Sequence, residues 1–250
     1  MIRSSFFLAF GFLVMAFSGG DDVNPREILR KAEEHTRGDK SYAEVTMEVV
    51  RPRFTRTISM RTWAMGEEYS LILITAPARD RGIAYLKRKN EIWNWMPSID
   101  RLIKLPPSMM GQSWMGSDFT NDDLVRESSV IDDFTHKLLG QEVVEGRTCH
   151  KIEMIPKPDK PIVWGKVIVW IAEDPYIQLK TEQYDEKGKL INRIEFSDIK
   201  TFDGREVPTK MTLIPLDKPG QNTILTQHKM DFNPAIDEDF FSIQNLQRVR

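Results

Sequence analysis

The stretch Ala43–Val49, AEVTMEV, alternates apolar and polar residues one by one. Side chains of a strand point to opposite faces in turn, so this period of two predicts a strand with one buried face. Similar runs recur along the rest of the chain, about a dozen in all, and turn pairs such as Glu145-Gly146, Lys187-Gly188 and Asp203-Gly204 separate them. Because no helix long enough for a parallel crossover lies between these runs, the sheet should be antiparallel.

One helix is predicted ahead of the strands, over Pro25–Arg37. Asn24 can cap its N-terminus, Pro25 suits the first helical position, and Gly38 supplies a left-handed stop. A narrow apolar stripe is formed by Ile28, Leu29 and Ala32. With only one apolar edge, the helix must lie against another element.

An insert of about 25 residues interrupts the predicted sheet between its sixth and seventh strands. It contains Met109–Leu124, MMGQSWMGSDFTNDDL, in which Thr120 and Asp123 have the spacing of a capping box and predict a short helix through Leu124 and Val125. Large apolar side chains on a backbone broken by glycine favour a surface that contacts an apolar partner, and methionine repacks easily in that role. An irregular part of an ordinary core is the alternative interpretation.

Residues 1–20 have the pattern of an export signal. Arg3 precedes the apolar run Phe6–Phe17, and the small residues Ser18, Gly19 and Gly20 follow it. The run is shorter than the roughly 20 apolar residues of a membrane-spanning helix. We therefore expect cleavage near Ser18–Gly20 and a periplasmic product, with an uncleaved anchor as the alternative.

The single cysteine, Cys149, allows no intramolecular disulfide, and its place in a strand-like run favours a buried, inert thiol. The formal net charge of -2 gives no bulk attraction to nucleic acid, and we expect no such partner. Charge is uneven, however: from Arg51 to Lys104 there are eleven Lys/Arg against five Asp/Glu, and from Ser117 to Glu145 two against eight. This asymmetry can orient a partner or a membrane surface, although a solvated face gives the same count.

Motifs of catalysis and metal binding are missing. The four histidines are scattered without metal-ligand spacing, and the aspartates after Ser117 lack the loop spacing of an EF-hand. Gly111–Met115 lacks the fifth-position glycine of a nucleophile elbow. The sequence therefore predicts no catalytic residues, no metal and no cofactor.

A closed or nearly closed sheet of about eleven strands is too wide for its own side chains to fill, so it encloses a cavity. The large apolar residues in excess of a simple core are candidates for its lining and for ligand binding, namely Trp93, Trp95, Met109, Met110, Trp114, Met115 and Phe119. An acyl chain is the natural ligand, because an exposed chain of about 16 carbons costs on the order of 12 kcal/mol in water.

Several motifs make the chain similar to a known family. They are Gly82-x-x-Tyr-Leu86, Trp93-x-Trp-x-Pro97, Arg101-x-x-Lys-Leu105, the more specific Gly116-Ser-Asp-Phe-Thr-Asn-Asp-Asp-Leu124, and Ile236-Asp-x-x-Phe240-Phe241. Over about residues 24–245 the chain resembles the outer-membrane lipoprotein-sorting (LolA-like) proteins, in the branch associated with resistance-nodulation-division (RND) exporters. The resemblance implies an incomplete antiparallel β-barrel, with helices covering a hydrophobic cavity that carries lipidated cargo across the periplasm without chemistry.

Residues and resemblance together predict one half-barrel domain over 21–250, mainly β, with the helix at 25–37 and the insert at 107–126 on its concave side. The predicted function is a periplasmic carrier that binds the acyl chains of a lipoprotein or lipid and moves it toward the outer membrane. The alternative is a non-catalytic accessory protein of an RND-type inner-membrane transporter. We expect a monomer that contacts membranes transiently.

Trp114 and Met115 lie between Gly111 and Gly116, which free the backbone to move. The sequence therefore predicts that this segment is a lid over the cavity. As a lid residue, Trp114 would pack against the ligand or, without one, against the inner face of the barrel. Replacing Trp114 by Asp would then weaken lipid uptake at little cost in global stability.

Overall fold

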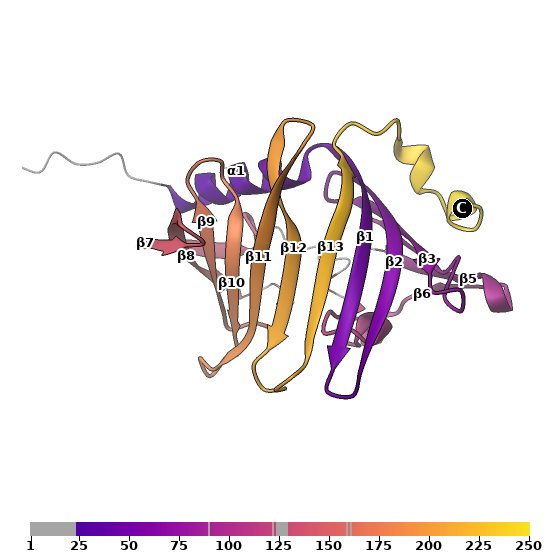
Figure 1. Ribbon diagram of the computed structural model, residues 1–250, viewed down its shortest axis with the longest axis horizontal. Helices are drawn as coiled ribbons and strands as arrows, with labels where there is room; N and C mark the ends of the chain where they lie inside the picture. Colours follow the sequence, from indigo (N-terminus) through magenta and orange to yellow (C-terminus); the bar gives the residue numbers. More distant parts are fainter. Residues whose placement is uncertain (1–23, 90, 122, 124–129, 159, 161) are drawn as a thin grey trace, which may run out of the picture.

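The structure is a computed structural model that describes residues 24–250, except 90, 122, 124–129, 159 and 161. Thirteen antiparallel strands form one sheet in the order β6-β5-β4-β3-β2-β1-β13-β12-β11-β10-β9-β8-β7 (Figure 1). The strands are β1 (Lys40–Arg51), β2 (Phe54–Met65), β3 (Tyr69–Ala76), β4 (Ala84–Arg88), β5 (Glu91–Met96), β6 (Arg101–Lys104), β7 (Phe134–Val144), β8 (Arg147–Pro156), β9 (Lys166–Ala172), β10 (Gln178–Tyr184), β11 (Leu190–Phe202), β12 (Arg205–Pro215) and β13 (Asn222–Asp231).

The predicted fold class, a mainly β and incomplete antiparallel barrel, is confirmed. The structure has thirteen strands, whereas the sequence predicts about eleven. The export signal predicted at residues 1–20 lies outside the described residues. Among the described residues, no helix is both long and apolar enough to cross a membrane.

Two of the predicted turn pairs form tight hairpins. Val144 pairs with Arg147 and Phe202 with Arg205, so two residues connect each pair of strands. Both turn residues have positive φ in each case, at 48° and 75° for Glu145-Gly146 and at 49° and 78° for Asp203-Gly204. This is the type I′ geometry, whose twist matches the twist of the strands.

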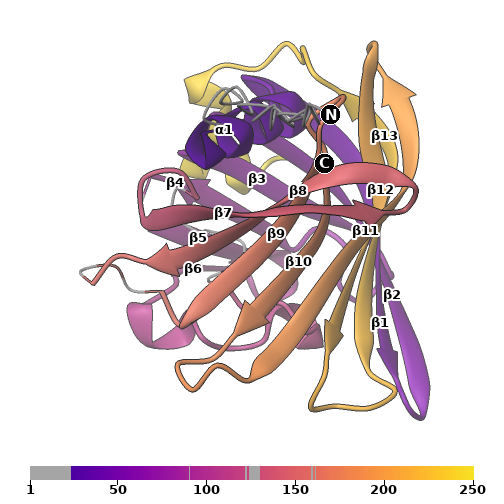
Figure 2. The same cartoon turned by 90° about the vertical axis from the view of Figure 1, so that its left-hand side faces the viewer.

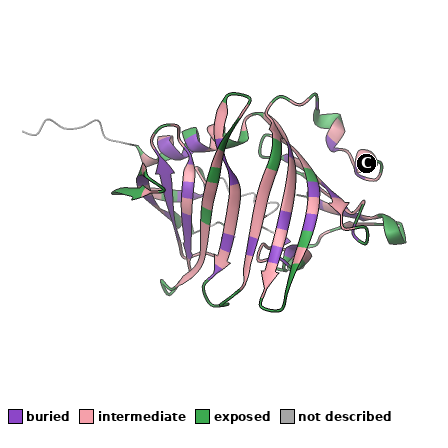
Figure 3. Cartoon of the chain, in the orientation of Figure 1, coloured by how far each residue is buried: buried purple, intermediate pink, exposed green. Residues whose placement is uncertain are grey.

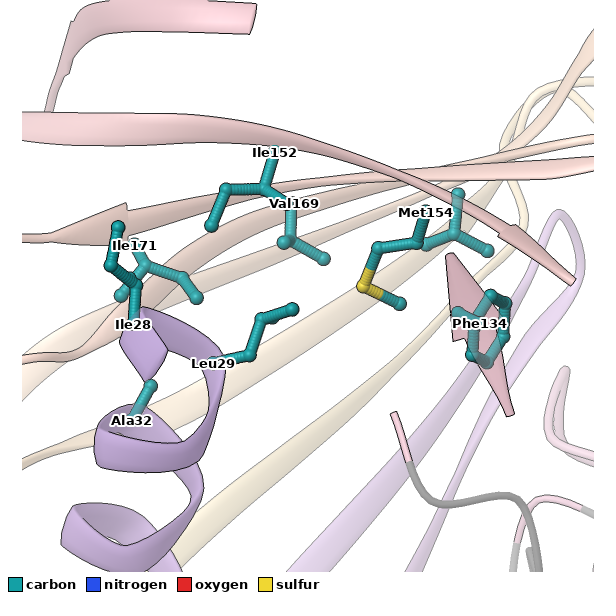
Figure 4. Close-up of a cluster of buried hydrophobic side chains, with 9 residues drawn as sticks. Ile28, Leu29, Ala32, Phe134, Ile152, Met154, Val169 and Ile171 are labelled. Carbon is teal, nitrogen blue, oxygen red and sulfur yellow. The ribbon is translucent and has the colours of Figure 1, made fainter. Parts of the chain in front are cut away.

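The helix α1 (Pro25–Arg37) forms where its caps predict it. The Asn24 side chain accepts a hydrogen bond from the Arg26 N–H at 3.0 Å, and Gly38 ends the helix with φ 64°. The sheet is strongly curved, and α1 lies on its concave side (Figure 2). There its apolar stripe packs on β7–β9 (Figure 4), in a buried cluster formed by Ile28, Leu29, Ala32, Phe134, Ile152, Met154, Val167, Val169 and Ile171.

Cross-strand partners in a sheet point to the same face, so the register tells which residues share a side. We call the face that carries α1 the inner face. One row of partners crosses it from β9 to β1: Val169, Thr181, Ile194, Leu213, Thr223 and Val49. A second row, from β11 to β2, is Phe196, Met211, Leu225, Met47 and Ile58.

The opposite, outer face of β2–β6 is covered by the C-terminal segment, which contains the helical turns η4 (Glu238–Phe241) and α3 (Ile243–Leu246). Phe241 and Leu246 are fully buried there. Burial alternates along many strands, as the colour bands in Figure 3 show. Both faces of this part of the sheet are therefore packed against something.

Candidate functional site

The seven predicted lining residues do not share one surface. Trp114, Met115 and Phe119 lie in an inner-face cluster on β1–β3, whose buried members are Met47, Val49, Ile58, Met60, Ile74 and Trp114. Trp114 is 2% exposed, and its ring meets that of Tyr85 edge to face with 5.7 Å between centroids. The insert thus covers one end of the inner face, and α1 covers the other.

Trp93 and Trp95 lie on the outer face instead. Trp93 pairs with Leu86 and Trp95 with Ala84, and both tryptophans belong to the cluster beneath the C-terminal segment. The prediction that they line one cavity together with Trp114 must be corrected, because the register of β5 turns their side chains to the other side of the sheet. A role of Trp93 and Trp95 as ligand contacts stays a prediction, and it concerns the outer face of the sheet.

Met109 and Met110 lie at the end of the turn η2 (Pro107–Met109) and just after it, both half-buried. The backbone oxygen of Met109 accepts hydrogen bonds from the Gln112 N–H at 3.1 Å and the Asn121 Nδ2 at 2.9 Å. This contact ties the two ends of the insert together. Neither methionine belongs to the buried clusters of the inner face.

The segment around η3 (Trp114–Gly116) folds back on itself. Ser113 and Thr120 form an isolated antiparallel bridge, and the Ser117 hydroxyl donates to the Trp114 oxygen at 2.7 Å. Thr120 and Asp123 exchange the hydrogen bonds of the predicted capping box, at 2.7 Å and 3.2 Å. The helix predicted through Leu124 and Val125 lies outside the described residues.

Two arginines fasten this segment to the sheet. Arg51 pairs with Asp118 at 2.9 Å, with side chains only 15% and 5% exposed, and also donates to the Gly116 oxygen at 2.8 Å. Asp118 accepts a further hydrogen bond from the Thr223 hydroxyl at 2.7 Å. Arg56 donates to the Met115 oxygen at 3.1 Å. We call Arg51, Arg56 and Asp118 the polar clamp. The sequence did not predict it, although Asp118 lies within the most specific family motif.

Arg56 also holds an acidic partner in place. Its Nη2 lies 2.6 Å from the Asp80 Oδ2, and Arg79 lies 3.3 Å from the other carboxylate oxygen. Burial raises the pKa of Asp80, but the hydrogen bonds and charges of the two arginines outweigh burial and lower its pKa below the usual value. The carboxylate therefore stays charged and keeps Arg56 oriented toward the insert.

Between α1 and the insert, the inner face carries a strip of half-buried apolar side chains. Its members are Val45, Ile194, Phe196, Met211 and Leu225. Register places all five on the inner face, next to the fully buried Met47 and Ile58 of the insert cluster. We call these five residues the inner strip. They are apolar surface on the concave side that α1 and the insert leave partly exposed.

The inner face also contains polar residues at β10–β12. Thr181, Gln183 and Thr209 are buried there, and Gln183 accepts a hydrogen bond from the Asn192 Nδ2 at 3.0 Å. Thr209 donates to the Asp198 oxygen at 2.6 Å. The apolar strip is thus bordered by side chains that can hydrogen-bond a polar group of a ligand.

Reactive groups are few. Cys149 is fully buried, and burial raises the pKa of its thiol, which disfavours the nucleophilic thiolate. Within the described residues, no group of three or more His, Cys, Asp or Glu side chains is placed to hold a metal ion.

Two pockets open elsewhere, one at β2 and β3 and the other over β1–β3 and β13. One of about 330 Å³ is lined by Arg61, Leu73, Ile74, Thr75, Arg81, Gly82, Val249 and Arg250. The other, of about 250 Å³, is lined by Glu44, Val45, Thr46, Ser59, Met60, Arg61, Thr75 and His228. Only the second includes a residue of the inner strip, Val45, so neither pocket is a container for the predicted ligand on that strip.

The chain is similar to known proteins in sequence and in fold. A family model described as "Uncharacterized protein" matches residues 66–248, more than half of the chain. No curated protein matches this chain in sequence. A DUF1329 family protein from Desulfovibrio piger has the same fold, with a TM-score of 0.80 and 24% identity over 89% of this chain and 98% of that chain.

Two further crystal structures agree. A domain from Vibrio parahaemolyticus, described as an outer membrane lipoprotein-sorting protein, gives a TM-score of 0.79 at 24% identity and covers 90% of this chain and 98% of its own. A LolA superfamily protein from Nitrosomonas europaea gives 0.74 at 23% identity, over 89% and 99%. At these identities the solved structures establish a shared fold, and the family model extends over most of the chain. The chain therefore belongs to the family that this model describes, and it has the LolA-like fold that its motifs predicted.

Proposed function

We propose that the protein is a non-catalytic periplasmic carrier that binds the acyl chains of a lipoprotein or lipid on its inner face and moves this cargo toward the outer membrane. The inner strip is the observation that carries the proposal. Five apolar side chains on the concave side lie half-exposed between two covers, where a packed core would bury them.

The energetics favour an acyl chain as the occupant. Each methylene moved from water onto apolar surface gains about 0.8 kcal/mol. An acyl chain laid along Phe196, Met211 and Leu225 would remove apolar surface of both partners from water. The polar border at Gln183 and Asn192 would then face a headgroup or the lipidated residue of a protein. The Vibrio parahaemolyticus domain, which is described as a lipoprotein-sorting protein, supports this cargo class.

The test is uptake of a fluorescent fatty-acyl probe by the purified, delipidated protein, together with native mass spectrometry of gently purified protein. Leu225→Gln places an amide in the inner strip and should weaken probe binding about tenfold or more, because a lost Leu contact is worth about 1.5–3 kcal/mol. Ile224→Gln is the matched control. Ile224 is half-buried like Leu225 but points to the outer face, so this variant should bind the probe as the native protein does.

Equal binding by both variants, or a native protein that carries no lipid and takes up no probe, would contradict the proposal. A protein that stays empty but captures an RND-type inner-membrane transporter would instead favour the accessory role predicted as the alternative. A thermal melt of each variant ensures that lost binding reflects the site and not unfolding.

A further inference from the structure

Exposed apolar side chains gather at one end of the sheet. Strands that follow one another in the chain pair antiparallel, so their connections alternate between the two ends. The connections β1–β2, β3–β4, β5–β6, β8–β9, β10–β11 and β12–β13 share one end. Four of the seven large apolar residues that are exposed in the described part of the chain lie in these connections or directly after one, namely Phe54, Ile99, Val163 and Leu216. The described connections at the opposite end contain none.

The two ends of the sheet also differ in charge. The connections at the apolar end contain eight Lys/Arg and six Asp/Glu, whereas those at the opposite end contain one Lys and six Asp/Glu. The nearby carboxylates of Asp118 and Asp133 are paired with Arg51 and Lys160. A membrane surface with anionic lipids attracts Lys and Arg, so the apolar end suits such a surface and the acidic end does not.

Two neighbouring hairpins stand out at the apolar end. The β1–β2 and β12–β13 hairpins lie side by side at the lower edge of Figure 1, because β1 pairs with β13. A Cβ built on Gly220 would lie 3.8 Å from the Pro52 ring, so the two tips are next to each other. Phe54 is 60% exposed and Leu216 is 40% exposed. We call residues 52–54 and 216–220 the paired tips.

The paired tips also present free cations. Arg53 and Lys218 are exposed, and neither has a carboxylate within 4.0 Å among the described residues. Asp217 is the one acidic residue of the paired tips, so their net charge is positive. Apolar and aromatic side chains beside Lys and Arg are the composition of protein segments that enter the interface of an anionic bilayer.

We propose that the paired tips dock on the surface of a lipid bilayer that carries anionic headgroups. Phe54 and Leu216 enter the boundary between headgroups and acyl chains, and Arg53 and Lys218 contact lipid phosphates. Phe54 has the same parity along β2 as Ile58 and therefore lies on the inner side of its hairpin. Docking thus turns the insert end of the concavity toward the bilayer. The inference goes beyond the carrier function, since docking requires no acyl chain on the inner strip.

The experiment measures co-sedimentation of the full chain with two kinds of vesicle, phosphatidylcholine alone and phosphatidylcholine mixed with phosphatidylglycerol. F54S/L216S removes the apolar side chains of the paired tips and should weaken binding to the mixed vesicles about tenfold or more. R53Q/K218Q should weaken it about tenfold at low salt, because each cation near an anionic surface adds attraction. The apolar run at residues 6–17 is the same in every variant, so the variants are compared with one another.

Matched controls come from the opposite end of the sheet. Val143 is 67% exposed and lies near the β7–β8 connection, so Val143→Ser removes an exposed apolar side chain outside the paired tips. K89Q/K200Q changes the net charge as much as R53Q/K218Q does, at two exposed lysines near the acidic end. Both controls should bind the mixed vesicles as the native protein does.

The proposal is overturned if the native protein binds the two kinds of vesicle equally or binds neither. It is also overturned if F54S/L216S binds as well as the native protein, or if the controls lose as much as the tip variants. A native protein that binds no vesicle but forms a dimer that F54S/L216S dissociates would assign the paired tips to a second copy instead. Uptake of the fatty-acyl probe without vesicles should be unchanged in F54S/L216S, so failure of docking is distinguishable from failure of the carrier proposal. An unchanged thermal midpoint confirms that each variant is folded.

Discussion

Replacing Trp114 by Ala tests whether the insert is a fixed part of the inner-face core. The indole is 2% exposed and packs among Met47, Val49, Ile58, Met60 and Ile74. A buried tryptophan removes about 150–250 Å² from water, which at about 25 cal/mol/Å² corresponds to about 4–6 kcal/mol. Truncations of this size in cores cost about 3–5 kcal/mol, and we expect a loss in that range.

This expectation differs from the small cost that the sequence predicts for a mobile lid. The reason is the polar clamp: Arg51 and Arg56 donate hydrogen bonds to the backbone oxygens of Gly116 and Met115, so the chain directly after Trp114 is fixed to the sheet. A loss of about 3–5 kcal/mol should lower the thermal midpoint of a chain of this length by roughly 6–20 °C.

Thermal and urea unfolding give the stability, and uptake of the fatty-acyl probe is measured on the same samples. Met110→Ala is the control, because Met110 lies in the same insert but outside the buried clusters, and it should cost about 1 kcal/mol or less. A loss below about 1 kcal/mol for Trp114→Ala, combined with lost probe uptake, would refute the core assignment. It would show that the insert opens independently of the sheet, as a lid does.

Three further outcomes are expected. Asp118→Asn should lower the free energy of unfolding in urea by about 3–5 kcal/mol, because Arg51 is left buried without its charged partner. As a control, Arg26→Gln at the exposed Arg26–Asp132 pair should cost under about 1 kcal/mol. Equal losses in the two variants would contradict the role of the polar clamp. Burial and the hydrogen bond to Glu182 raise the pKa of Tyr184 from 10.0 to about 12, so the free energy of unfolding should fall as pH rises between these two values. Tyr184→Phe should remove that part of the alkaline loss of stability. If the pH profile of stability is the same in the variant, Tyr184 is not the cause of the loss. A Cβ on Gly165 would lie 2.6 Å from the Asp185 oxygen, so Gly165→Ala should lower the midpoint in a thermal melt by the equivalent of about 1–3 kcal/mol, while Gly111→Ala, with open space around its Cβ, should not.

Much of the fold was predictable because its signals are local. The cap residues around α1 and the turn pair Glu145-Gly146 determine the conformation of the few residues next to them. The structure has both where the sequence predicts them. The interruption between β6 and β7 was predictable for the same reason, since glycine and proline break the alternation there.

The assignment of faces was not predictable, as Trp93 and Trp95 show. A period of two tells which residues share a face but not which face is the concave one. Here both faces of β3 and β4 are apolar, because the C-terminal segment around Phe241 covers the outer face as the insert covers the inner one. That cover comes from a segment far away in the sequence, and no local pattern in β3–β5 predicts it.

The sheet ends at β6 on one side and at β7 on the other, and the strand order of the described residues does not join them. A closed barrel has a radius fixed by its number of strands and their stagger. A sheet without closure has no such condition, so its radius of curvature is set by twist and by what packs in its concavity. Repacking α1 against Ile152 and Val169 can therefore widen or narrow the concavity without breaking a ladder hydrogen bond. A change in the width of the concavity among proteins of this architecture then requires only apolar substitutions at the helix–sheet contact, and the strand framework stays as it is.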